Sequence, residues 1–138
     1  MNTDKKEEEK KDRRIVPVIP EAELTDKIIG AAFAVHNELG SGFLERVYEN
    51  AMVIQLRSMG ICLEQQKQLQ VHFMGVVVGD YQADLVVEGR VLLELKSVST
   101  LDPVHEAQIM NYLRASGIKV GLLLNFGRPK LQFKRFVC

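Results

Sequence analysis

The hydrophobic periodicity of this chain changes near Ile61, and that change limits the folds that are open to it. Before it, apolar residues recur at helical spacing over 21–39 and 43–59, and a glycine follows each pattern. After it, short alternating runs rich in β-branched residues indicate strands, interrupted by one more helical pattern over 103–116. The expected strands are 67–73, 76–78, 81–88, 91–97, 118–126 and 131–137. This order predicts an α/β fold in which helices flank a central mixed β-sheet.

The chain has the length of one domain, preceded by a charged segment. Its 138 residues are enough for a single hydrophobic core. Residues 1–14 contain no apolar side chain after Met1, so we expect a flexible tail and lead-in over 1–20 and a folded domain over 21–138. No apolar run approaches the roughly 18–20 residues that span a bilayer, and the N-terminus is too charged for a secretory signal. We therefore expect a cytoplasmic protein with no membrane partner.

Charge is unevenly distributed along the chain. Residues 15–106 carry six basic and thirteen acidic side chains, a net charge of −7, whereas 107–138 carry six basic and no acidic ones. This separation suits a cation-binding pocket beside a phosphate-binding surface, although a chance distribution over a solvated surface gives the same numbers. The basic residues that we consider as contacts to a nucleic acid are Arg114, Lys119, Arg128 and Lys130.

Two acids and a lysine interrupt a very apolar pair of expected strands. Strand alternation places Asp84 on the face opposite to Ala83 and Leu85, and it places Glu94 and Lys96 together on one face of the next strand. A tight turn between the strands brings the three charged residues together. Asp84 and Glu94 are then predicted to hold Mg²⁺ or Mn²⁺, with Lys96 orienting a water molecule or offsetting phosphate charge. The alternative is a buried ion pair that only neutralises itself.

Two further pairs of residues have helical spacing. Glu45 precedes Tyr48 by three residues, so both share one face of the second helix, which we expect to be buried. Glu45 is either a metal ligand or an acid stabilised by the helix dipole. Gln108 and Tyr112 are four residues apart on the third helix, where both can point the same way, either into a site or into ordinary packing.

These motifs, taken in order, resemble those of a known family. They are Gly42-x-x-Glu45-x-x-Tyr48, Tyr81-x-Ala83-Asp84, Glu94-x-Lys96, Gln108-x-x-x-Tyr112 and the segment Gly121 to Gly127. Over about residues 22–137 the sequence is similar to the bacterial GxxExxY protein family, which is assigned to the PD-(D/E)XK nuclease superfamily. The resemblance implies a restriction-endonuclease-like core.

The resemblance also implies roles for individual residues. Asp84 and Glu94 become the metal-binding acids, with Glu45 as an additional one, and Lys96 becomes the catalytic lysine. Gln108 joins the catalytic set, because Gln108 and Tyr112 match the Gln-x-x-x-Tyr element that RecB-type nucleases use beside the active site, and Tyr48 and Tyr112 support the site. Ala83 stands where the superfamily name has proline, a departure that concerns backbone shape more than chemistry.

Two functions of different class are consistent with these features. The first is a Mg²⁺- or Mn²⁺-dependent phosphodiesterase that cuts DNA, with RNA as the other nucleic acid to consider. Specific DNA interfaces bury ~1,000–2,500 Å² of protein surface, so a chain this short favours a homodimer or a protein partner. The second is a non-catalytic module that binds nucleic acid or protein and retains the nuclease fold.

Overall fold

The computed structural model describes residues 19–138, and the charged segment 1–14 lies outside the described residues. Three helices and five strands follow in the order α2 (Ala22–Leu39), α3 (Glu45–Ser58), β1 (Leu63–Phe73), β2 (Val76–Val87), β3 (Val91–Lys96), α4 (Pro103–Ser116), β4 (Val120–Asn125) and β5 (Gln132–Val137). Within 19–138, no helix is both long enough and apolar enough to cross a membrane.

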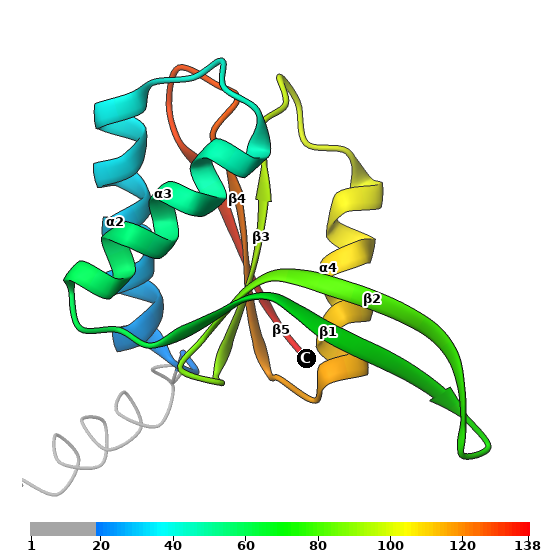
Figure 1. Ribbon diagram of the computed structural model, residues 1–138. Helices are drawn as coiled ribbons and strands as arrows, with labels where there is room; N and C mark the ends of the chain where they lie inside the picture. Colours follow the sequence, from blue (N-terminus) through cyan, green and yellow to red (C-terminus); the bar gives the residue numbers. More distant parts are fainter. Residues whose placement is uncertain (1–18) are drawn as a thin grey trace, which may run out of the picture.

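The five strands form one mixed sheet in the order β1-β2-β3-β4-β5. Neighbouring strands are antiparallel except β3 and β4, which are parallel because α4 connects them. Helices α2 and α3 cover one face of the sheet and α4 covers the other (Figure 1). The predicted central mixed sheet flanked by helices is confirmed.

The hairpin of β1 and β2 is longer than the sequence suggested. Gly79 and Asp80 were expected to form a turn between two short strands, yet both are paired with β1 inside one continuous strand. The hairpin turn lies at Met74 and Gly75, between the expected strands 67–73 and 76–78, and their φ angles of 50° and 80° suit a two-residue loop. The hairpin therefore extends beyond the rest of the sheet, as Figure 1 shows.

The expected alternation of β2 breaks at Asp84. Ala83 packs in the cluster under α4, whereas Leu85 packs in the cluster under α2 and α3, although both were expected on one face. Opposite Asp84, Gln66 has a φ of 53°, and the two residues are skipped in the pairing of β1 with β2. The backbone therefore turns locally at this point, which re-aims the side chains on either side of it.

Candidate active site

Asp84 and Glu94 lie where β2 and β3 separate. The backbone pairing of these strands ends at Leu85 and Leu93, one residue before the two acids. Across the fork, the Asp84 amide donates to Glu94 Oε1 at 3.0 Å, and the Leu95 amide donates to Asp84 Oδ2 at 2.8 Å. Each carboxylate thus binds a backbone group of the other strand, and the predicted proximity of the two acids is confirmed.

The surroundings of Asp84 and Glu94 oppose the ionisation of both carboxyl groups. Glu94 is only 4% exposed, and its burial, with the negative charge of Asp84 adding to it, raises the pKa of its carboxyl to about 8. Burial also raises the pKa of Asp84, against the hydrogen bond from Leu95, and the charge of Glu49 raises it further. A cation between the two carboxyl groups would relieve this repulsion. The surroundings of Asp84 and Glu94 therefore favour the binding of a cation.

Lys96 lies two residues beyond Glu94 on β3, and the alternation of the strand puts both on the side of α4. Its positive charge lowers the pKa of Asp84 and of Glu94. The ion pairs found among residues 19–138 do not join Lys96 to either acid. The alternative of a self-neutralising ion pair is therefore not what the structure shows.

The acid that α3 buries is not the one that the sequence indicated. Glu45 is exposed at the start of the helix, although its charge still raises the pKa of both Asp84 and Glu94. Glu49, one turn later, is only 4% exposed and accepts hydrogen bonds from Gln65 and Gln66. The expectation of a buried Glu45 was wrong, because the buried face of α3 begins at Tyr48 and Glu49, and Glu45 lies on the exposed side of the first turn.

Glu49 and Gln66 are site residues that the sequence reasoning missed. The Gln66 amide donates to Glu49 Oε1 at 2.6 Å and approaches Asp84 Oδ1 at 3.5 Å, so it bridges the two carboxylates. The spacing of Glu49, four residues after Glu45, was the available signal. Nothing local marked Gln66, because its position depends on the turn of the backbone opposite Asp84.

Tyr48 is fully buried and organises the loop before α3. Its hydroxyl donates to the Gly40 carbonyl at 2.6 Å and accepts from the Phe43 amide at 3.3 Å, and its ring stacks on Phe126. The Phe43 carbonyl in turn accepts from the Ser97 hydroxyl at 2.6 Å, next to the end of β3. Tyr48 therefore supports the loop beside Lys96 rather than reaching the acids.

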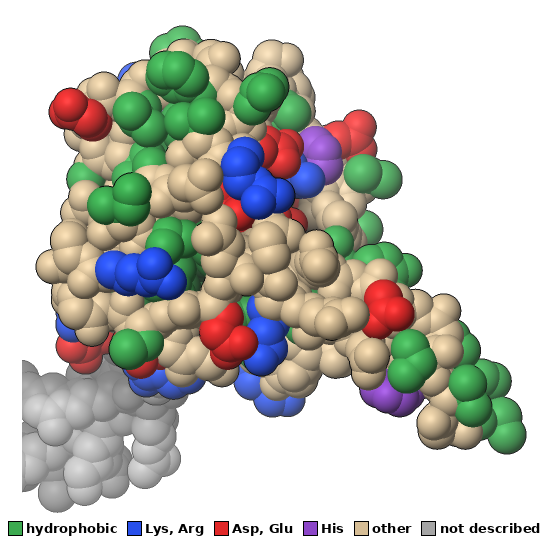
Figure 2. Space-filling view, viewed as in Figure 1, with side chains coloured by type: hydrophobic (Ala, Val, Ile, Leu, Met, Phe, Trp, Pro, Cys, Tyr) green, Lys and Arg blue, Asp and Glu red, His purple; other side chains and the backbone are tan. Residues whose placement is uncertain are grey.

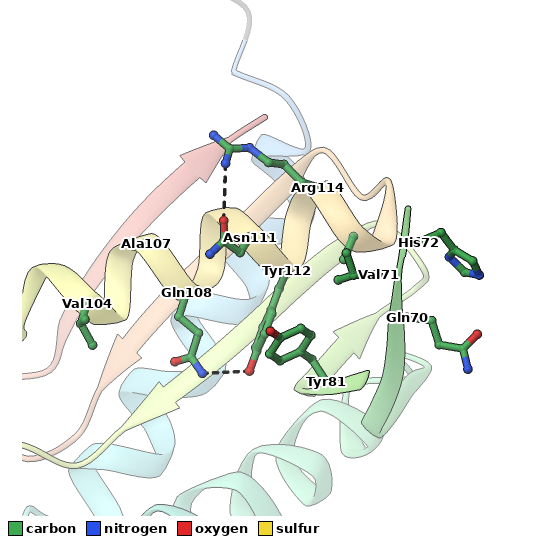
Figure 3. Close-up of a pocket in the computed structure, with 11 residues that line it drawn as sticks. Gln70, Val71, His72, Tyr81, Val104, Ala107, Gln108, Asn111, Tyr112 and Arg114 are labelled. Carbon is green, nitrogen blue, oxygen red and sulfur yellow. Dashed lines mark hydrogen bonds between the residues drawn. The ribbon is translucent and has the colours of Figure 1, made fainter. Parts of the chain in front are cut away.

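Gln108 and Tyr112 do point the same way from α4. The Gln108 amide donates to the Tyr112 hydroxyl at 2.8 Å, as the close-up in Figure 3 shows. Burial raises the pKa of the Tyr112 hydroxyl, and the charge of Glu94 raises it further. The pair therefore faces the acids from the helix that covers this side of the sheet.

The four basic candidates do not form one surface. Arg114 is on α4, and Lys119 precedes β4 at the end of the sheet remote from Lys96. Arg128 and Lys130 follow β4 and lie at the same end as Lys96, since β3 and β4 are parallel. In the space-filling view, side chains of both signs gather where α3 passes the end of β3 (Figure 2).

Two acids, Asp84 and Glu94, are placed to hold a divalent cation, rather than the three that the sequence predicted. Within residues 19–138, no group of three or more His, Cys, Asp or Glu side chains is arranged to hold a metal ion. The predicted trio of Asp84, Glu94 and Glu45 is therefore not assembled. Mg²⁺ usually takes one or two carboxylates and completes its shell with water and phosphate, so Asp84 and Glu94 suffice as protein ligands.

Comparison with known proteins identifies the family of the chain. Residues 22–136 match the model of a family described as the PD-(D/E)XK nuclease superfamily. The crystal structure of SSO0001 is similar at 16% identity and a TM-score of 0.55, over 85% of this chain and 58% of that chain. An alkaline exonuclease (LHK-Exo) from Laribacter hongkongensis is 12% identical with a TM-score of 0.42, over 87% and 72% of the two chains. No curated protein matches the sequence.

Proposed function

Since the chain belongs to the PD-(D/E)XK nuclease superfamily, we propose that it is a Mg²⁺- or Mn²⁺-dependent nuclease that hydrolyses phosphodiester bonds in DNA. The observation that carries this proposal is the meeting of Asp84 and Glu94 at the fork between β2 and β3. Two mostly buried carboxyl groups that repel each other destabilise the folded state. The binding of a cation is a function that explains their presence.

Asp84 and Glu94 are the residues that would hold the cation. A bound divalent cation supplies positive charge that polarises a phosphoryl oxygen and makes a water molecule more acidic. The backbone amides of Asp84 and Leu95 fix one oxygen of each carboxylate, so both side chains are oriented before any ligand arrives. Gln66, held by Glu49, restrains Asp84 from the other side.

The remaining residues act on the substrate and on water. Lys96, on the same strand as Glu94, places an ammonium group where it can orient the attacking water or offset charge on the phosphate. Gln108 is positioned by the Tyr112 hydroxyl to bind the substrate beside the acids. Glu45, exposed at the start of α3, assists from the rim as an acceptor of water-mediated contacts.

We further propose that the chain is a GxxExxY protein with a RecB-like site. The order of Gly42, Glu45 and Tyr48 supports the first assignment, and the hydrogen-bonded pair of Gln108 and Tyr112 supports the second. The chain spans 58% of the length of the SSO0001 chain, and its size favours a second copy or a protein partner in gripping DNA. Arg128 and Lys130 are the basic residues best placed for phosphate contacts, because they share the Lys96 end of the sheet.

The test is cleavage of labelled single-stranded, duplex and branched DNA with Mg²⁺ or Mn²⁺. The wild type is compared with Lys96→Ala, with Glu94→Gln and with Lys27→Ala, a matched control at an exposed lysine of α2. We expect metal-dependent cutting that falls by at least ~100-fold in the first two variants and is unchanged in the control.

One observation favours the non-catalytic alternative. The hydrogen bonds of Asp84 and Glu94 to the opposite strand give both acids a structural role that needs no chemistry. If no DNA is cut and neither metal changes the melting temperature, the acids are structural and the binding-module function replaces the nuclease.

A further inference from the structure

A groove of about 880 Å³ separates α4 from the β1–β2 hairpin. Its residues from α4 include Gln108 and Tyr112, so the groove reaches the pair that faces the acids. Tyr81 stands on the hairpin side, and Figure 3 shows Tyr81, Tyr112 and Gln108 directed toward one another. The volume lies within the usual ~300–1,000 Å³ of ligand pockets.

The groove has an aromatic side chain, Tyr81, that is partly exposed on its hairpin side. Tyr81 is 49% exposed, and its ring centre is 5.7 Å from that of Tyr112. Gly79 leaves space for this ring, because a Cβ there would meet Tyr81 Cε2 at 3.2 Å. The hairpin therefore holds an aromatic side chain at the wall of the groove with one face open.

The polar lining of the groove suits a polyanion. None of its eleven lining residues is an acid, although acidic residues outnumber basic ones in the middle of the chain. Arg114 adds positive charge to the lining and donates to Asn111 Oδ1 at 3.4 Å, and Gln108 presents an amide that can pair with the edge of a base. Positive charge, amides and an aromatic face are the combination with which proteins hold unpaired nucleotides.

We infer that this groove binds an unpaired nucleotide of a DNA strand, with its base stacked on Tyr81 and its phosphate directed toward Asp84 and Glu94. The inference rests on the proposed nuclease function and adds a substrate class to it. In a duplex both faces of a base are covered by its neighbours, so Tyr81 can stack only on a base that has left the helix or was never paired. The preferred substrate is then single-stranded DNA, or duplex DNA with unpaired nucleotides.

The test is binding of a fluorescent twelve-nucleotide oligothymidine, and of a blunt duplex of about the same length, measured by anisotropy in Ca²⁺ and again in EDTA. Tyr81→Ala removes the stacking face, Tyr81→Phe keeps it, and Phe133→Ala truncates an exposed aromatic on the opposite face of the sheet. We expect Tyr81→Ala to weaken binding of the single strand by about 5- to 150-fold, with Tyr81→Phe and Phe133→Ala near wild type.

Circular dichroism and thermal unfolding of each variant show whether it is folded. If Tyr81→Ala is folded and binds the single strand as the wild type does, or if the wild type binds the duplex more tightly than the single strand, the groove inference is overturned. The groove inference is also overturned if the wild type does not bind the single strand in either buffer. Stacking-dependent binding without any cleavage would instead refute the nuclease proposal alone, and cleavage indifferent to Tyr81 would refute the groove alone.

Discussion

Replacing Glu94 by glutamine is expected to stabilise the metal-free protein at high pH and to change it little at low pH. Burial raises the pKa of Glu94 from 4.5 to about 8, helped by Asp84. An acid whose pKa is raised by folding stabilises the folded state when the pH is below the pKa of the unfolded state. This stabilisation is lost as the pH rises from 4.5 through 8. The full difference corresponds to at most about 5 kcal/mol, and local relaxation reduces the expected gain to about 2 kcal/mol.

Urea unfolding in EDTA at about pH 5 and about pH 9 measures this difference. The matched control is Glu64→Gln, whose carboxylate is exposed on β1 and pairs with Lys67, so its stability should change by only a few tenths of a kcal/mol at either pH. A Glu94→Gln variant that is no more stabilised at high pH than at low pH would refute the reasoning. Added Mg²⁺ or Mn²⁺ should raise the melting temperature of the wild type more than that of the variant at high pH.

Three further substitutions test the framework around the site by urea unfolding. Tyr48→Phe removes the hydroxyl that holds the loop before α3 and should cost about 1–3 kcal/mol; an unchanged midpoint would contradict that role. Gly127→Ala places a Cβ 2.3 Å from the Val98 amide nitrogen and should cost roughly 3 kcal/mol or more, whereas a neutral effect would mean that this close approach is absent. Met74→Asn, before Gly75 in the hairpin turn, should stabilise by about 0.5–1 kcal/mol, and a loss of stability would argue against the positive φ at this position.

The sequence by itself determined where the helices and most of the strands lie, and that Asp84 and Glu94 come close together. Hydrophobic periodicity depends on local geometry, so it located α2, α4 and β3 to within a few residues. Asp84 and Glu94 could be paired because they belong to consecutive strands joined by a tight turn, where the register follows from the length of the turn. Gln108 and Tyr112 were placed together for the same kind of reason, since a four-residue spacing fixes one helix face.

Only the tertiary structure decided which residues surround that pair. Glu49 rather than Glu45 is buried because of how α3 lies against β1, and Gln66 reaches Asp84 because of one left-handed residue in an edge strand. The separation of Lys119 from Arg128 follows from the direction of β4, which the charge pattern alone does not specify. Such features depend on the packing of segments distant in the sequence, whereas periodicity and spacing report only on neighbours within a turn or a hairpin.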